Sequence, residues 1–187
     1  MRKLGQASGV EAMSLYNHVS NKEDLLDGLV DMVFAEIELH CEGGDWKTAM
    51  RKRAISARDA LSRHRWAIGL MESRTRPGPA NLRHHDAVLR CLREAGFTIE
   101  MAGHAYSALD SYIYGFALQQ ANLPFETGEE AAEVAGEMFR SFPVHEYPWL
   151  VEFATQRAMQ PGYSYAAEFE VGLDLILNGL EQMLAAS

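Results

Sequence analysis

The side chains with the greatest capacity for specific chemistry lie in the first 22 positions, where basic, hydroxyl, amide and thioether groups share one short segment. They are Arg2, Met13, Ser14, Tyr16, Asn17, His18 and Lys22. The basic and phenolic groups can bond phosphate oxygens, which fixes a protein on a duplex without reading its sequence. The short polar groups and the methionine can approach base edges in the major groove. The set therefore favours contact with double-stranded DNA, and the alternative is an ordinary helical hairpin with a solvated polar face.

Two short helices joined by a tight turn are needed to present these side chains together. Gly9 can adopt a positive φ without steric cost, which such a turn requires. Leu4 faces inward on the first helix, and Leu15 and Val19 lie one turn apart on the second. The spacing predicts a helix-turn-helix.

Helical periodicity continues through the rest of the chain, and no strand alternation or internal repeat is present. The next helix begins with a capping box, Ser20-x-x-Glu23, and carries an apolar stripe from Leu25 to Ile37. Gly96 is suited to end a helix and Thr98 to begin one. The helices are expected at about 20–40, 46–64, 80–95, 98–121, 129–141, from Pro148, and 164–184. The fold class is all-α.

Charge is distributed unevenly along the 187 residues, whose formal net charge is −9. Residues 1–22 carry a net charge of +2, whereas residues 126–187 hold eleven acids and two arginines. A small cationic end on an acidic body suits a protein that touches phosphate at one end only. No apolar run is long enough to cross a membrane and no signal peptide is recognised, so the expected location is the cytoplasm.

Catalytic and metal-binding patterns are weak. None of the histidines has an acidic residue three positions before it, as a helical di-metal carboxylate enzyme would need, and no nucleophile elbow or phosphate-binding glycine loop occurs. Adjacent histidines on a helix point about 100° apart, so His84 and His85 are expected at the surface or at a dimer edge rather than on a metal. Cys41 and Cys91 lie outside any CxxC pair and are expected to be buried, reduced thiols. An enzyme is a remote alternative, and no cofactor or metal is expected.

The beginning of the chain resembles the DNA-binding domain of the tetracycline-repressor (TetR) family of bacterial regulators. It reads RKLGQASGVEAMSLYNHVSNKEDLLDGLVD and carries the pattern G-V-x-x-x-x-L-Y-x-H-V-x-N-K-x-x-L-L. Two later segments, HRWAIGLMESRTRPGPANLRHHDAVLRCLREAGFT and FEVGLDLILNGLEQML, are similar to the ligand-binding and dimerisation domain of the same family. The resemblance implies that Met13, Ser14, Tyr16, Asn17, His18 and Lys22 contact DNA, together with Arg2 from the preceding helix.

The resemblance also implies a further helix before residue 1, packed across the helix-turn-helix. Without this cover each large aliphatic side chain forgoes roughly 1.5–3 kcal/mol of burial, so a mobile head with weak DNA affinity is expected. A misassigned start, proteolysis or a trimmed record would each account for the difference, and the first is favoured because Met1 reads naturally as an internal methionine. We expect an incomplete DNA-binding domain with its connecting helix at residues 1–42, and a ligand-binding and dimerisation domain at residues 43–187.

A homodimer is expected from two helices. Small residues recur every four positions at Gly103, Ser107, Ser111 and Gly115, which lets another helix approach closely. The last helix is apolar around much of its circumference, which implies burial on two sides. Its predicted interface residues are Phe169, Leu173, Ile176 and Leu180. In the family these two helices of each subunit form a four-helix interface, and the alternative is a central helix buried within one monomer.

A small-molecule effector site is expected in the larger domain, lined by apolar walls and a few orienting polar groups. The candidates are Arg53, Trp66, Met71, His104, Tyr112 and Gln119, each of which is also a plausible core residue. Aligned with the tetracycline repressors, the positions that hold the drug and its magnesium are Glu38, Arg53, Met71 and Gln119. A thioether does not ligate Mg²⁺ and an arginine repels it, so the expected effector is metal-free and apolar or weakly anionic. The sequence thus indicates a ligand-responsive DNA-binding regulator, a repressor released from its operator by an effector, and the main alternative is a ligand-binding dimer that no longer binds DNA.

Overall fold

The computed structural model describes residues 13, 19–41, 45–71, 73–141 and 143–186. Every regular element in these ranges is a helix, which confirms the all-α prediction; the only β-type pairing there is an isolated bridge between Thr127 and Ser164. The chain divides into two compact units, Met1–Tyr106 and Ser107–Ser187. This division is one of packing, and the predicted functional boundary after residue 42 stays a prediction.

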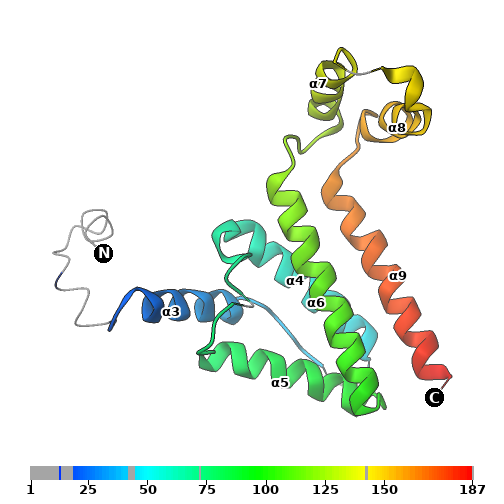
Figure 1. Ribbon diagram of the computed structural model, residues 1–187. Helices are drawn as coiled ribbons and strands as arrows, with labels where there is room; N and C mark the ends of the chain where they lie inside the picture. The colour runs from blue at the N-terminus through cyan, green and yellow to red at the C-terminus, as the bar shows by residue number, and fades with distance from the viewer. Residues whose placement is uncertain (1–12, 14–18, 42–44, 72, 142, 187) are drawn as a thin grey trace. The chain divides into compact units, whose positions relative to one another are not determined.

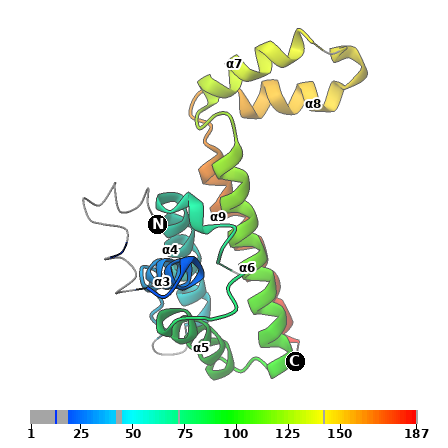
Figure 2. The same cartoon turned by 60° about the vertical axis from the view of Figure 1, so that its left-hand side comes forward.

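Three helices pack together in the first unit: α3 (Lys22–Ala35), α4 (Trp46–Arg63) and α5 (Pro79–Glu94). A short 3₁₀ turn, η1 (Arg65–Ala67), follows α4, and α6 (Ile99–Asn122) begins in this unit. Figures 1 and 2 show α3 lying beside α5. The side chains buried completely or nearly so in this unit include Phe34 of α3, Leu61 of α4, Leu92 of α5 and Phe97 just after α5. This packing fixes the helix that follows the predicted DNA-contacting segment.

Both ends of α3 differ from the sequence prediction. Asn21 caps the helix by accepting a hydrogen bond from the backbone of Asp24, so the cap lies one residue after Ser20. The helix ends at Ala35 instead of His40. Beyond it, the backbone N–H of Glu38 donates to Ser56 of α4 at 2.9 Å, while Ile37 is buried. Tertiary contacts therefore hold residues 36–41 out of the helical conformation that their periodicity favours.

Cys41 and Cys91 form a disulfide, with their Cα atoms 5.8 Å apart, so the prediction of two reduced thiols was wrong. The prediction relied on compartment and on the absence of a CxxC pair, neither of which reports a contact between residues 50 positions apart. The bond joins the segment after α3 to the last turn of α5.

Besides the rest of α6, the described part of the second unit contains α7 (Gly128–Phe139), the 3₁₀ turn η2 (Val144–Glu146), α8 (Pro148–Phe153) and α9 (Tyr165–Ala185). A π-helical turn, η3 (Ala154–Ala158), continues α8. Leu109, Ile113, Phe169, Leu173 and Leu177 are buried. Gly172 lies so close to Tyr112 that a Cβ atom there would come within 2.2 Å of the phenol oxygen.

The structure confirms that Gly96 follows the end of α5 and that Thr98 precedes the beginning of α6. Gly96 adopts φ 101°, a left-handed conformation that glycine reaches without a Cβ penalty. Thr98 then accepts a hydrogen bond from the backbone of Met101 at 3.2 Å and caps α6.

Candidate functional site

Most of the predicted DNA-contacting side chains lie outside the described residues. They are Arg2, Ser14, Tyr16, Asn17 and His18. Leu4, Gly9 and Leu15 of the predicted helix-turn-helix also lie outside the described residues. Met13 is 71% exposed, and Lys22 is exposed at the first position of α3. Both described members of the set are therefore accessible to a partner, and their contact with DNA stays a prediction.

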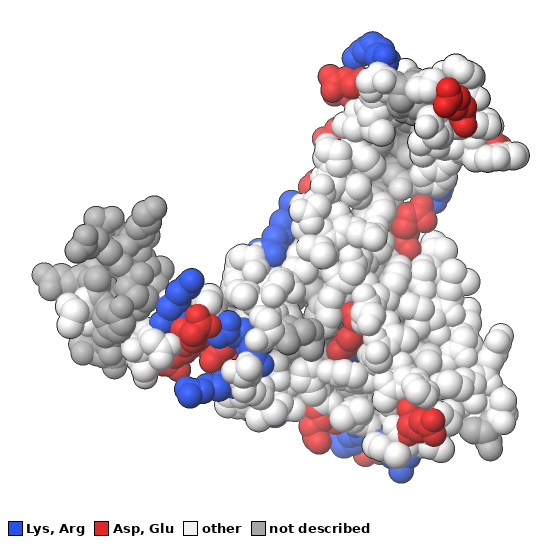
Figure 3. Space-filling model, viewed as in Figure 1, with Lys and Arg blue, Asp and Glu red and all other residues white. Residues whose placement is uncertain are grey.

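A polar cleft of about 450 Å³ lies at the beginning of α3, where Lys22 stands beside charged groups from the loop that precedes α5. Figure 3 shows basic and acidic side chains side by side around this part of α3. The residues that line the cleft are Asn21, Lys22, Glu23, Asp24, Asp27, Arg74, Thr75 and Arg76.

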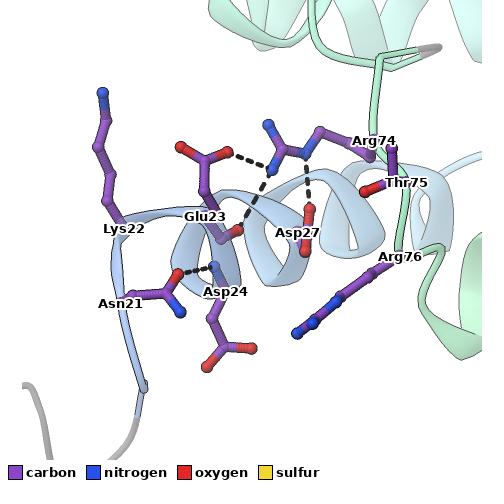
Figure 4. A pocket seen from close by; sticks show the side chains of 8 residues that line it. All are labelled: Asn21, Lys22, Glu23, Asp24, Asp27, Arg74, Thr75 and Arg76. Carbon is purple, nitrogen blue, oxygen red and sulfur yellow. Dashed lines mark hydrogen bonds and ion pairs between the residues drawn. The ribbon is translucent and has the colours of Figure 1, made fainter.

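Arg74 is the residue that joins the two walls of this cleft (Figure 4). Its Nε donates to Asp27 and its Nη2 to Glu23, both at 2.6 Å. The Arg74 side chain is only 12% exposed, and its partners Glu23 and Asp27 raise the pKa of Arg74. The loop between η1 and α5 is thus ion-paired to the first and second turns of α3, which links the loop directly to the beginning of the helix.

A second group of polar residues is buried between α4 and α5. Arg53 is 1% exposed and its Nε donates to Nε2 of His84 at 3.1 Å. Burial, followed by the charge of Arg53 and by His85, lowers the pKa of His84 to about 3. His84 is therefore a neutral imidazole whose Nε2 accepts from the arginine. The expectation that His84 lies at the surface was wrong, because its ring packs against Phe34 of α3.

A hollow of about 280 Å³ adjoins His84 between α3, the segment after it and α5. Six of its eight lining residues are apolar, and Arg83 and His84 supply the polar side chains. The lining residues are Phe34, Ala35, Ile37, Leu39, Ala80, Arg83, His84 and Ala87. Sequence reasoning identified Arg53 and missed its partner, although His84 lies on the same helical face as Ala80 and Val88, which would have indicated burial.

The other predicted effector-site residues are dispersed. In the first unit Met71 is buried, whereas Trp66 is 47% exposed and His104 is exposed beside Glu100, one turn earlier on α6. In the second unit Tyr112 stacks on Phe169 and donates a hydrogen bond to its carbonyl oxygen at 2.9 Å.

Gln119 lies near the end of α6 and contacts the first residue of α9, Tyr165. It is exposed and accepts a hydrogen bond from Tyr165 at 2.6 Å. Tyr165 in turn stacks on Phe116, which sequence reasoning had not selected. A separate apolar cavity of about 150 Å³ lies among α7, α8 and η3.

The predicted dimer residues fall into two groups. Gly103, Ser107, Ser111 and Gly115 are all exposed. On α9, Phe169 and Leu173 are fully buried in this single chain, Leu180 is 7% exposed and Ile176 is half-buried. The apolar side chains that α9 leaves at the surface are instead Val171 and Leu175, which are 57% and 70% exposed.

Across the described ranges, no three His, Cys, Asp or Glu side chains are grouped so that they could hold a metal ion. Glu38, at a position aligned with a magnesium-site residue, is exposed and uses its backbone N–H to bond Ser56. Among the described helices, none is long and apolar enough to cross a membrane.

Comparison with known proteins agrees with this architecture. Residues 40–184 match the family model for the tetracyclin repressor-like, C-terminal domain. The chain is 31% identical to the class C tetracycline repressor of Escherichia coli over 97% of its own length and 81% of that protein.

Two solved structures extend the comparison to the fold. The Streptomyces coelicolor TetR family protein ActR, in complex with actinorhodin, is 28% identical with a TM-score of 0.76, over 98% of this chain and 87% of that one. A TetR variant from Acinetobacter baumannii AYE, in complex with minocycline, is 25% identical with a TM-score of 0.64, over 98% and 85%. The chain belongs to the TetR family of ligand-responsive, DNA-binding transcriptional regulators.

Proposed function

We propose that this chain acts in the cytoplasm as a homodimeric repressor, whose hold on operator DNA is released by a small-molecule effector through the link between Arg74 and α3. The observation that carries the proposal is the pair of short ion pairs from Arg74 to Glu23 and Asp27. They couple a loop of the ligand-sensing body to the helix that follows the predicted DNA-contacting segment. An effector that binds one arrangement of this loop better than another shifts the population of α3 positions.

The effector is metal-free and apolar or weakly anionic. Support comes from the buried Arg53–His84 pair, which can orient a polar or anionic group, and from Met71, a buried thioether unsuited to Mg²⁺. The relatives named above bind actinorhodin and minocycline, which makes these two compounds suitable first probes. We expect actinorhodin to raise the melting temperature without added metal and minocycline with Mg²⁺ to leave it nearly unchanged.

The dimer is proposed to form through α6 and α9. The exposed small residues of α6 allow close approach of a second helix, and exposed Val171 and Leu175 offer apolar surface for burial. Two copies are needed because paired reading heads must lie about 34–36 Å apart to enter successive major grooves on one face of the duplex.

DNA binding is tested by fluorescence anisotropy with DNA from immediately upstream of the chain's own gene and with unrelated DNA of equal length. Specific binding should survive moderate salt, whereas contacts made to phosphate alone weaken steeply as salt rises. Equal binding to both duplexes that collapses at moderate salt, or no binding to either, would overturn the repressor function in favour of a ligand-binding dimer.

The role of Arg74 is tested with Arg74→Gln and a matched control, Arg76→Gln. Both changes remove one positive charge from the same cleft, but the described part of the chain gives Arg76 no ion pair. We expect Arg74→Gln to change the affinity for the upstream DNA by about fivefold or more, roughly 1 kcal/mol, and Arg76→Gln to change it far less. Equal effects of the two substitutions would mean that charge alone matters and that α3 is not coupled through Arg74.

A further inference from the structure

The Cys41–Cys91 disulfide lies at the end of a continuous contact between α3, the segment after it and α5. The side chain of Asp31 accepts a hydrogen bond from the backbone of Asn81 at the beginning of α5, at 2.8 Å. Two residues of the middle of α5, His84 and His85, then pack their rings on Phe34. The disulfide follows in the last turn of α5. The disulfide therefore joins the segment after α3 to the last turn of α5, beyond the contacts that α3 itself makes with α5.

The two sulfur positions differ in access. Cys91 is 1% exposed, packed within the first unit, whereas Cys41 is half-buried in the non-helical segment after α3. Cys41 is therefore the more accessible of the two residues to a small oxidant or reductant. This asymmetry suits a pair in which one thiol is attacked from solvent and the other resolves the intermediate.

α3 has non-covalent ties to the first unit besides the disulfide. α3 is also attached by Asp31, and Glu36 just beyond its end pairs with Arg63 of α4 and with His64, the residue after α4, at 2.8 Å in each case. The first unit thus keeps non-covalent ties to α3 when the disulfide opens. What the bond adds is a covalent limit on how far residues 36–41 can move from α5.

We propose that Cys41 and Cys91 form a reversible thiol–disulfide switch that sets the mobility of α3. This inference rests on the proposed function, which places the chain in the cytoplasm. A cytoplasmic protein meets a reducing pool of small thiols, so its disulfide persists only under oxidising conditions. Reduction frees the segment after α3, and oxidation fastens it to α5. In the oxidised dimer the DNA-binding segment samples fewer positions, so it loses less conformational entropy on binding and holds DNA more tightly.

The oxidant is a low-molecular-weight disulfide such as oxidised glutathione. The Cys41 thiolate attacks one of its sulfur atoms, forms a mixed disulfide and expels one glutathione thiolate. The Cys91 thiolate then attacks the Cys41 sulfur, closes the protein disulfide and expels the second glutathione. Two protein thiols are oxidised, one small disulfide is reduced to two thiols, and the two protons leave with the products.

The first test measures the redox change itself in the full-length chain. Incubation with millimolar reduced glutathione should yield the dithiol, and transfer to oxidised glutathione should return the disulfide, seen as the loss of two hydrogen masses by intact mass spectrometry. A disulfide that survives the reduced buffer in the native protein, or a dithiol that does not close in the oxidised one, would overturn the switch.

The second test measures mobility by hydrogen exchange of peptides from residues 21–41 in the two redox states. We expect exchange in this region to be about tenfold slower in the oxidised protein, with peptides of α9 unchanged. Cys41→Ser, at the half-buried position, should show the same exchange in residues 21–41 under oxidising and reducing conditions. If the serine variant is unstable, Cys91→Ala serves the same purpose. Equal exchange in both redox states of the wild-type chain would contradict the proposed control of α3.

The third test measures affinity for the upstream DNA in each redox state. The oxidised form should bind about threefold more tightly, and Cys41→Ser should bind equally in both buffers. Equal or weaker binding by the oxidised form would refute the link to DNA. Absence of binding in either state refutes the repressor function instead, and leaves the redox and exchange results to decide the switch.

Discussion

Lowering the pH should destabilise the first unit through His84. Burial beside Arg53 lowers the pKa of His84 to about 3, whereas in the unfolded chain the group has its ordinary value of about 6.5. The unfolded state therefore takes up a proton that the folded state refuses. Stability from this source is constant above about pH 6.5 and falls as the pH drops from there towards 3.

The size of the loss follows from the two pKa values. Over the range in which only the unfolded state binds the proton, the slope is about 1.4 kcal/mol per pH unit. Between about pH 7.5 and about pH 5 the His84 contribution to the free energy of unfolding should fall by about 2 kcal/mol. This is a substantial share of the 5–15 kcal/mol that is typical of a folded domain.

Urea denaturation at the two pH values measures this loss in the wild-type chain and in His84→Gln. A glutamine amide oxygen can accept from Nε of Arg53 as the imidazole does, yet it does not titrate. We expect the variant to lose about 2 kcal/mol less than the wild type over the same range. His104→Gln, which removes an imidazole from an exposed position on α6, is the matched control for the substitution itself.

If His84→Gln and the wild type lose stability in parallel between the two pH values, His84 takes up its proton in the folded state at an ordinary pH. The pair would then have to open or repack on protonation, and the assignment of a neutral imidazole that accepts from Arg53 would be wrong.

Two further predictions concern the second unit and the dimer. Gly172→Ala places a Cβ 2.2 Å from the phenol oxygen of Tyr112 and should destabilise by about 1–3 kcal/mol, whereas Gly179→Ala, on the same helix with no atom within 4 Å, should be neutral or stabilise by up to about 1 kcal/mol. Equal melting temperatures for the two variants would contradict this packing. Leu175→Glu should shift the chain from dimer to monomer in sedimentation velocity, by removing roughly 1.5–3 kcal/mol of apolar burial per subunit, while Leu82→Glu, also exposed, should not. A dimer that survives Leu175→Glu would exclude this face of α9.

Local signals were sufficient for most helix boundaries. Gly96 and Thr98 act within a few residues of themselves, and the structure places the end of α5 and the beginning of α6 where they predicted. The end of α3 was misplaced because Ile37 continues the apolar stripe. The contact that stops the helix, from the backbone of Glu38 to Ser56, spans 18 positions and leaves no trace in periodicity.

For the functional residues too, positions on a helix could be predicted from local sequence, whereas their long-range partners could not. Arg53 could be selected from its position on a helix, but the partner that determines its environment, His84, lies 31 residues away. Arg74 was not selected, because an exposed-looking arginine beside a proline–glycine turn gives no sign that Glu23 and Asp27 lie opposite it. Long-range ion pairs and the Cys41–Cys91 bond depend on tertiary packing, which charge and spacing alone do not specify.

The attachments of α3 also determine how it can move. Near its end it is held by Asp31, by the ring of Phe34 and by Glu36, whereas near its beginning the ties to the loop are those of Arg74. A helix of 14 residues is about 21 Å long, so a tilt of about 10° about its held end displaces its beginning by about 4 Å. Hydrogen bonds to base edges require donor–acceptor distances of about 2.7–3.2 Å. In the proposed homodimeric repressor, a displacement of about 4 Å in each subunit exceeds this range. We therefore expect a shift of the Arg74 loop that tilts α3 by about 10° to weaken DNA binding.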